Sequence, residues 1–304
     1  MYYLLFGFLY LFSLLPFFIL YLVSDFVYVL LYYIIGYRRK VVEGNIALAF
    51  PEKSVSERTR IAKQFYKNFV DTFIETIKLI SLSDAEFDRR CKGDFSQVNA
   101  IAENGGNVLF LAIHQFNWEY VNLFLGRNMK IPFLGVYAKI ENKAVNKIFY
   151  DIRAKYGSIL IANTAFQRQI VEWLRKQYAI CLAADQATAP EKGYWLNLFG
   201  RPAPFVTGPH KTSAKSKPAV VYIKMVKLKR GFYELIPCEV VTNADEYTPE
   251  TFALKYRDYI EALIREQPAN YLWSHRRWKH TFSEANEKQW VDKEPPGKHE
   301  KLSF

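Results

Sequence analysis

The chain has 304 residues, half of them hydrophobic and 17% aromatic, and it carries a formal net charge of +11 at pH 7. This length can bury a substantial core, in one large domain or two small ones. The basic charge suits anionic lipid or nucleic acid. The absence of zinc-ligand spacing, of a helix-turn-helix pattern and of an aromatic RNA-binding motif argues against a nucleic-acid partner.

The N-terminus is strongly apolar. Residues 1–24 carry no charged side chain, and a helix of this length, at about 1.5 Å per residue, could cross a bilayer core of about 30 Å. Pro16 interrupts this run, and a second apolar run at 26–36 follows Asp25 and is too short to cross alone. A basic cluster at 38–40 comes directly after it.

Two membrane arrangements stay open for residues 1–40. Either the first run spans the bilayer, with the body on the cytoplasmic side by the positive-inside rule, or both runs lie in the interface as bent, monotopic helices. A secretory signal peptide is not indicated, because no basic residues precede the apolar run and no small-residue cleavage site follows it. A pair of buried core helices fits less well, because large apolar side chains occur on every face.

In the body, periodic helical segments alternate with short β-type runs. Residues 54–57 read SVSE, a capping box that starts a helix reaching about residue 81. Further helices are predicted at 117–128, 141–156, 165–177, 209–216 and 249–266, and strands at 108–113, 131–138, 158–162, 178–184, 218–228 and 232–241. This alternation predicts an α/β fold with a mixed, mainly parallel sheet flanked by helices.

Three further segments complete the organisation of the chain. A Gly- and Pro-rich loop is expected at 187–209. The catalytic body is expected to cover 41–282. The tail at 283–304 is polar and charged and is expected to be loose.

The strongest candidate for an active site is the segment VLFLAIHQFNWE at 108–119. His114 falls where the apolar strand stops, Asn117 can cap the next helix, and Glu119 lies in that helix's first turn. Across such a junction Glu119 could hold one ring N–H of His114 and leave the other nitrogen free to take a proton. On spacing alone a structural or merely exposed pair is the commoner case, and the rest of the chain is what favours catalysis. Asp185 follows another apolar run, and ligands of such folds gather beyond the carboxyl ends of the strands.

Cysteine chemistry is not indicated. Cys91, Cys181 and Cys238 form an odd and widely spaced set, which predicts neither a disulfide framework nor a metal site. Cys181 lies in an apolar run and is predicted to be a buried thiol. Such usage is typical of a catalytic body in a reducing compartment.

The segment 271–280 is aromatic and basic. Arg276 and Arg277 alternate with tryptophan and histidine, a pattern that suits a surface facing phosphate and a membrane. Alternatively, the aromatic side chains complete the core, and for Trp273 this second interpretation is favoured.

Six segments in order resemble the bacterial lipid A biosynthesis acyltransferases, a group of lauroyl and myristoyl transferases within the lysophospholipid acyltransferase-like superfamily. They are NIALAFPE (45–52), the His-x4-Glu motif (114–119), IFYDIRAKYG (148–157), AADQ (183–186), LFGRPAPFVTG (198–208) and YLWSHRRWK (271–279). The chain departs from the pattern at Leu198, where many relatives have a second Phe, and at His210, which stands where histidine is unusual.

The resemblance implies roles for several residues. His114 would be the general base and Glu119 would orient its ring. Arg153 would stabilise the oxyanion or bind a phosphate, and Asp185 would fix Arg153 or cap a turn. The loop containing Phe199 and Gly200 would shape the site, and Arg276 and Arg277 would contact substrate.

The resemblance also implies the reaction. A fatty acyl group would pass directly from an acyl carrier protein thioester to a hydroxyl of a lipid A precursor, at the cytoplasmic side of the bacterial inner membrane, with no metal, no cofactor and no acyl-enzyme. The basic surface suits docking of an acidic carrier protein. Two alternatives remain at this point: the same fold acting on another lipid acceptor, and a non-enzymatic membrane protein that binds lipid.

Overall fold

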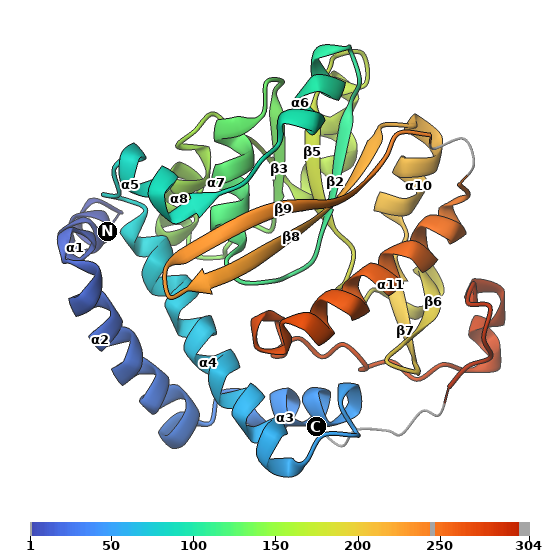
Figure 1. The fold of residues 1–304 in the computed structure, drawn as a ribbon, viewed down its shortest axis with the longest axis horizontal. Helices are drawn as coiled ribbons and strands as arrows, with labels where there is room; N and C mark the ends of the chain where they lie inside the picture. Colours follow the sequence, from blue (N-terminus) through green and yellow to red (C-terminus); the bar gives the residue numbers. More distant parts are fainter. Residues whose placement is uncertain (1, 244–246, 298–304) are drawn as a thin grey trace.

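A seven-stranded mixed sheet forms the centre of the computed structural model, which describes residues 2–243 and 247–297 (Figure 1). Five neighbouring strands run parallel, and β9 and β1 at one edge run in the opposite direction. The spatial order is β1 (Cys91–Lys92), β9 (Phe232–Val241), β8 (Ala219–Lys229), β2 (Val108–Ala112), β5 (Ala179–Ala183), β3 (Phe133–Tyr137) and β4 (Ile159–Ala162). The predicted α/β fold with a mainly parallel sheet is confirmed.

The central strands have apolar side chains on both faces because helices cover both faces. On β2, Val108 and Phe110 pack into one buried cluster, whereas Leu109 and Leu111 pack into the other. The first cluster contains side chains of α5 (Asp84–Arg90), α6 (Ser96–Glu103), α7 (Trp118–Asn128) and α8 (Lys143–Ala154). The second contains side chains of α3 (Arg39–Ala49), α4 (Val55–Lys78) and α11 (Pro249–Glu266).

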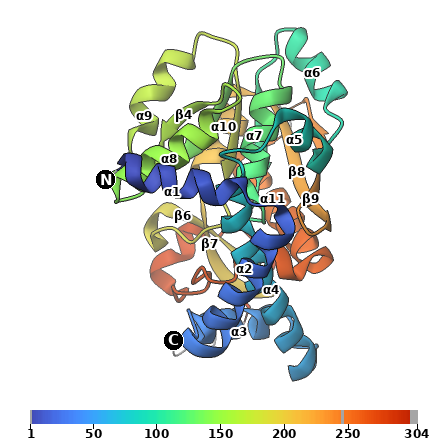
Figure 2. The same ribbon diagram turned by 90° about the vertical axis from the view of Figure 1, so that its left-hand side faces the viewer.

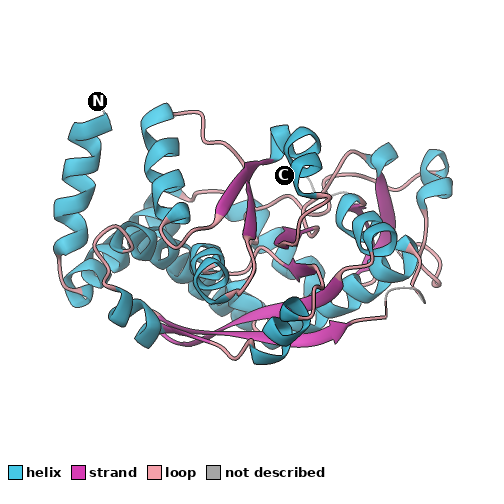
Figure 3. Ribbon diagram, turned by 90° about the horizontal axis from the view of Figure 1, so that it is seen from above, coloured by secondary structure: helices cyan, strands magenta, loops and turns pink. Residues whose placement is uncertain are grey.

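The antiparallel hairpin β8–β9 is longer than the rest of the sheet. Figure 3 shows these two long strands extending past the shorter ones. Their connection at Arg230 and Gly231 reaches α2, since the Tyr21 hydroxyl lies against Gly231 and Arg230 contacts Asp25. The hairpin therefore joins the sheet to the N-terminal helices.

The N-terminal helices lie along one side of the body (Figures 1 and 2). The chain breaks at Pro16, as predicted, between α1 (Tyr2–Leu14) and α2 (Phe17–Val29). It does not break at Asp25, and α2 continues into a π-helical turn at Leu30–Ile35. Only Phe17–Ile35 among the described residues forms a helix both long and apolar enough to cross a membrane.

Local signals explain how α4 begins and where a second hairpin turns. The Ser54 hydroxyl accepts from the Glu57 N–H and the Glu57 carboxylate accepts from the Ser54 N–H, which is the predicted capping box. The expected loop at 187–209 instead contains an antiparallel hairpin, β6 (Gly193–Leu198) and β7 (Arg201–Val206), followed by the start of α10 (Gly208–Ser216).

Two other expectations differ from the structure. The helix expected at 165–177 is a series of short pieces: 3₁₀ turns at Asn163–Ala165 and Ile170–Trp173 flank one α-turn, α9, at Phe166–Gln169. The described part of the tail, 283–297, packs on the body, because Asp292 accepts from the Asn197 N–H and from Arg257. Residues 298–304 of that tail lie outside the described part of the chain.

Candidate active site

His114 and Asp185 meet because their strands are neighbours in register. Ala112 at the end of β2 pairs with Ala183 at the end of β5, and each polar residue follows two positions later. The Asp185 Oδ1 lies 2.8 Å from the His114 Nδ1 and accepts from the His114 backbone N–H at 3.2 Å. Two parallel strands that are separated in the sequence thus deliver one histidine–carboxylate pair to the carboxyl edge of the sheet.

The pair is electrostatically coupled. Burial opposes the charged imidazolium, but the adjacent Asp185 carboxylate outweighs this effect and raises the pKa of His114 above its ordinary value. Burial likewise opposes the charged form of Asp185, and the histidine contacts reverse this, so the pKa of that carboxyl lies below its ordinary value. Asp185 is almost fully buried, whereas 32% of the His114 side chain stays accessible. With Nδ1 held by Asp185, Nε2 is the nitrogen that can exchange a proton with a bound molecule.

Glu119 and Arg153 form a second ion pair, between α7 and α8. The Arg153 Nε and Nη2 both donate to the Glu119 carboxylate, with Nε–Oε2 at 2.9 Å and Nη2–Oε1 at 2.5 Å. Glu119 is buried and Arg153 is nearly so. A two-point contact of this kind fixes the plane of the guanidinium group.

His114 of the first pair and both members of the second pair border one cavity of about 280 Å³ between the sheet and α7 and α8. His114, Glu119 and Arg153 supply polar groups to its wall, and most of the remaining wall is apolar. The apolar lining includes Phe133, Gly135, Val136, Leu160 and Cys181. An apolar space with a few convergent polar groups is the usual form of a site for a small or chain-like ligand.

Gly135 allows close packing within the cavity wall. A Cβ at this position would lie 2.6 Å from the Asn122 Oδ1 and 3.1 Å from the Leu160 Cδ2. Neither neighbour could accommodate a methyl group there without moving. Any side chain at Gly135 would therefore displace Asn122 or Leu160, which both line the cavity.

The sequence-based assignment of partners was wrong in two respects. Asp185, rather than Glu119, holds the imidazole, and Glu119, rather than Asp185, holds Arg153. The reason is geometric, because Glu119 lies in the first turn of α7, which packs beside α8, whereas Asp185 emerges from the strand next to β2. The predicted meeting of His114, Glu119, Arg153 and Asp185 in one region is nevertheless what the structure shows.

The residues between His114 and Glu119 make hydrogen bonds to residues that do not line the cavity. Gln115 accepts from the Met225 N–H of β8. Asn117 occupies the N-cap position of α7, but its side chain makes no capping bond and instead donates to Glu75 of α4 at 3.1 Å. The expectation that Asn117 caps the helix through its side chain is therefore wrong.

Tyr256 is a supporting residue that the sequence did not single out. Its hydroxyl donates to the Ala112 carbonyl at 2.7 Å and accepts from the Ala184 N–H at 3.0 Å, so it ties together the ends of β2 and β5. A tyrosine on the apolar face of α11 has no sequence signal that separates this role from ordinary core packing.

Phe199 and Gly200 lie outside the cavity wall. They form the two-residue turn between β6 and β7, with φ of 52° and 68°, and the Phe199 N–H donates to Glu261. Two left-handed residues in succession are typical of a tight hairpin turn, which explains the glycine. Neither borders the cavity, so the structure gives them a part in the hairpin.

The two arginines of the C-terminal segment differ from each other. Arg277 is 1% exposed, donates to the Pro204 carbonyl at 2.7 Å and lies over the Phe205 ring, so it belongs to the interior rather than to a surface patch. Burial lowers the pKa of Arg277. Arg276 is exposed. Trp273 is buried in the core, as favoured from the sequence.

Cys181 borders the cavity, but its chemistry does not suit a nucleophile. Burial raises the pKa of this thiol to about 12, so it stays protonated at neutral pH. Among residues 2–243 and 247–297, no three His, Cys, Asp or Glu side chains gather as ligands for a metal ion.

Comparison with known proteins identifies the family. The family described as bacterial lipid A biosynthesis acyltransferase matches residues 1–280. This chain belongs to that family. It is 24% identical over 254 residues to the lipid A biosynthesis lauroyltransferase of Escherichia coli (strain K12), covering 80% of this chain and 79% of the relative. It is also 24% identical to the lipid A biosynthesis palmitoleoyltransferase of the same organism over 249 residues, with the same coverage.

A third relative matches a shorter region. The lipid A biosynthesis acyltransferase 2 of Shigella flexneri is 22% identical over 157 residues, which are 51% of this chain and 49% of that protein. The family match covers His114, Glu119, Arg153 and Asp185 together with the N-terminal helices. The histidine–carboxylate pair and its cavity therefore belong to an acyltransferase.

Proposed function

We propose that this acyltransferase moves a fatty acyl group from an acyl carrier protein thioester to a hydroxyl of a lipid A precursor, at the cytoplasmic side of the inner membrane. The main support is the His114–Asp185 pair at the mouth of a largely apolar cavity in a chain of this family. The relatives' names specify lauroyl and palmitoleoyl transfer, and the apolar cavity suits a fatty chain.

His114 acts as the general base. The Asp185 carboxylate holds Nδ1–H and leaves Nε2 to accept the proton of the acceptor hydroxyl as its oxygen attacks the thioester carbonyl. Asp185 also stabilises the imidazolium that this transfer creates. The carrier thiolate then leaves and takes up that proton, which returns His114 to its neutral form.

Arg153 stabilises the charge that develops on the carbonyl oxygen. Glu119 engages Nε and Nη2, whereas Nη1 makes no hydrogen bond to any residue in the described part of the chain. Nη1 is thus the group available to donate to the oxyanion, and Glu119 is the positioning residue that sets its direction. The high thiol pKa of Cys181 supports direct transfer without an acyl-enzyme.

The acceptor class is tested in cells that lack this gene. Mass spectrometry of lipid A and of total lipids should show lipid A without one secondary acyl chain, and the wild-type gene should restore it. Unchanged lipid A together with a missing acyl chain in a glycerophospholipid, an aminolipid or another glycolipid would overturn the proposed acceptor. No acylation change in any lipid class would overturn the proposed reaction.

The donor is tested separately with the purified full-length protein. Turnover with acyl carrier protein thioesters should fall as salt rises, because a basic protein surface attracts an acidic carrier. Equal turnover with acyl-coenzyme A at matched concentrations would contradict a carrier-protein donor.

A further inference from the structure

The N-terminal helices present an apolar face that no part of the described chain covers. On α2 the exposed side chains Phe18, Leu22, Phe26 and Val29 recur every three or four residues and so form one stripe along the helix. On α1, Leu4, Phe8 and Leu11 are more than half exposed. Apolar patches of this extent mark a site for a membrane or a partner.

We propose that α1 and α2 lie in the plane of an anionic membrane surface and do not cross the bilayer. The proposal deepens the membrane location proposed above and rests on it. It is supported by the hydrogen bonds and ion pairs that hold the opposite face of α2 against the body.

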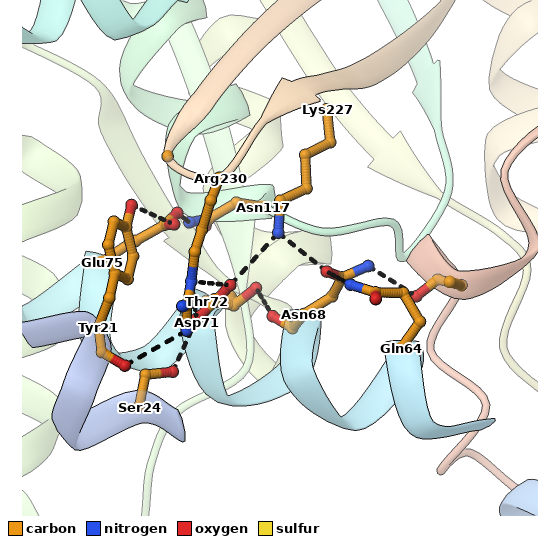
Figure 4. Close-up of polar contacts among 12 residues, drawn as sticks. Tyr21, Ser24, Gln64, Asn68, Asp71, Thr72, Glu75, Asn117, Lys227 and Arg230 are labelled. Carbon is orange, nitrogen blue, oxygen red and sulfur yellow. Dashed lines mark hydrogen bonds and ion pairs between the residues drawn. The ribbon is translucent and has the colours of Figure 1, made fainter. Parts of the chain in front are cut away.

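Buried hydrogen bonds tie α2 to α4 along its length. The Ser24 hydroxyl donates to Asp71 at 2.7 Å, and the Tyr21 hydroxyl donates to Glu75 at 3.0 Å (Figure 4). Ser24, Asp71 and Glu75 are almost completely buried. A helix that left this position to cross a bilayer would remove one hydrogen-bond donor from each of two buried carboxylates and uncover both, although Asp71 would keep Arg230 and Glu75 would keep Asn117 and Tyr233.

The centre of the apolar segment Phe17–Ile35 contains a charged residue that belongs to an ion-pair network. Asp25 stands next to the midpoint of this segment and is paired with Arg230 at 2.8 Å. Arg230 also pairs with the buried Asp71 at 2.7 Å, within the network of Figure 4. In a spanning helix Asp25 and its partners would lie at mid-bilayer, where charged side chains are strongly disfavoured. In an in-plane helix the same groups stay on the protein side.

Cations line the flank of α2 beside the apolar stripe. The Lys63 Nζ lies 5.5 Å from the centre of the Tyr33 ring, and the Lys67 Nζ lies 5.3 Å from that of Tyr28. Lys40, a few residues beyond the π-helical turn that follows α2, is also exposed. Tyrosine rings paired with lysines at the edge of an apolar helix face match the headgroup zone of a bilayer that contains acidic lipid.

Both ends of α1 are also fastened to the body, which Figure 2 shows lying behind α1 and α2. The Tyr2 hydroxyl donates to Asp151 of α8, and the Lys78 and Ser81 side chains donate to the Ser13 carbonyl. The start of α1 therefore lies against α8, the helix that carries Arg153 of the cavity wall. A lipid acceptor could then reach His114 without leaving the membrane surface.

The test measures the depth of labels on α2 in the full-length protein. Cysteines replace Phe18, Leu22, Phe26 and Val29 one at a time, in a background with Cys181→Ser and Cys238→Ser. Each carries a nitroxide, and its relative contact with oxygen and a nickel chelate reports depth in phosphatidylethanolamine–phosphatidylglycerol vesicles. We expect four similar depths. A spanning helix would place the labels at Phe18 and Phe26 about 12 Å apart in depth, at about 1.5 Å per residue, and that gradient would overturn the proposal.

A second arm tests charge and alternative occupants. Lys63→Gln with Lys67→Gln should weaken binding to phosphatidylglycerol-containing vesicles about twenty-five-fold, since each basic residue near such a surface contributes about fivefold. Lys288→Gln, at an exposed site on another part of the chain, should leave binding unchanged. Dipolar broadening between labels without vesicles would show a second copy on this face and contradict a lipid occupant. Neither the depth of the labels nor vesicle binding depends on turnover. A failure of the in-plane arrangement can therefore be distinguished from a failure of the proposed reaction.

Discussion

Glu75 and Asp185 are two carboxylates buried to almost the same degree, yet their surroundings differ. Glu75 accepts from the neutral groups of Tyr21, Asn117 and Tyr233, and burial raises its pKa. Asp185 contacts a titratable ring that borders a cavity, and its pKa is lowered. Burial alone therefore does not mark a catalytic carboxylate, whereas a titratable partner beside an accessible space does.

The groups around the two carboxylates also differ in whether they leave a polar atom available to a ligand. Around Glu75 the network joins α2, α4 and β9 and fixes the architecture. Around Asp185 the groups leave Nε2 of His114 and Nη1 of Arg153 available to a ligand. Substitutions around Asp185 should therefore lower turnover, whereas substitutions around Glu75 should lower stability.

His114→Ala should have the largest effect. Removing the base should lower kcat by about a hundredfold to ten-thousandfold, the usual contribution of general-base catalysis, with little change in thermal stability. His280→Ala, at a histidine outside the cavity wall, is the matched control and should keep full activity. Turnover of His114→Ala within tenfold of wild type would remove the imidazole from the mechanism.

Arg153→Lys should follow. It retains the positive charge beside Glu119 but loses the two-point contact and the oriented Nη1, so kcat should fall on the order of a hundredfold. Arg127→Lys alters the exposed pair with Asp88 and should change kcat less than twofold. If the two variants lowered kcat equally little, Arg153 would have only a structural role and would not stabilise the oxyanion.

Gly135→Ala should have an intermediate effect. The added methyl group must displace the Asn122 or the Leu160 side chain, and both line the cavity, so kcat/KM for the preferred fatty chain should fall about tenfold. Shorter acyl donors should lose less. Gly7→Ala, which has open space around it, should leave the chain-length profile unchanged, and an unchanged profile for Gly135→Ala would contradict a fatty chain in this cavity.

Glu75→Ala should affect turnover least and stability most. Three buried donors would lose their acceptor, which should lower the free energy of unfolding by about 3 kcal/mol, while kcat per folded molecule stays within about threefold. Glu43→Ala, at an exposed pair with Arg39, should cost less than about 1 kcal/mol in the same chemical denaturation experiment. A loss of turnover comparable to that of Arg153→Lys would show that the network also serves the chemistry, through Asn117.

Much of the site was predictable, but its pairing was not. The apolar runs before His114 and Asp185 located both strand ends, because buried parallel strands are continuous apolar segments. Their contact depends on β2 and β5 being neighbours, although β3 and β4 lie between them in the chain. Nothing local encodes that order, so Glu119, the carboxylate nearest in sequence, was assigned to the ring.

Other differences have equally specific causes. Pro202 and Pro204 made β7 look like a loop, but this strand belongs to a two-stranded sheet in which proline can occupy edge positions. The alternation of basic and aromatic residues predicted Arg277 on a surface that faces phosphate and a membrane. Its bond to the Pro204 carbonyl and its place over the Phe205 ring exist only in the folded chain.

The pH dependence of kcat/KM in wild type and in Asp185→Asn shows whether His114, held by Asp185, is the base. A base must be neutral, and Asp185 raises the pKa of His114, so activity should rise with pH through a midpoint above the ordinary histidine value of about 6.5. Without the carboxylate the imidazolium loses its partner, so the midpoint should move to lower pH while the plateau falls. An unchanged midpoint in Asp185→Asn would contradict an imidazole base held by this carboxylate.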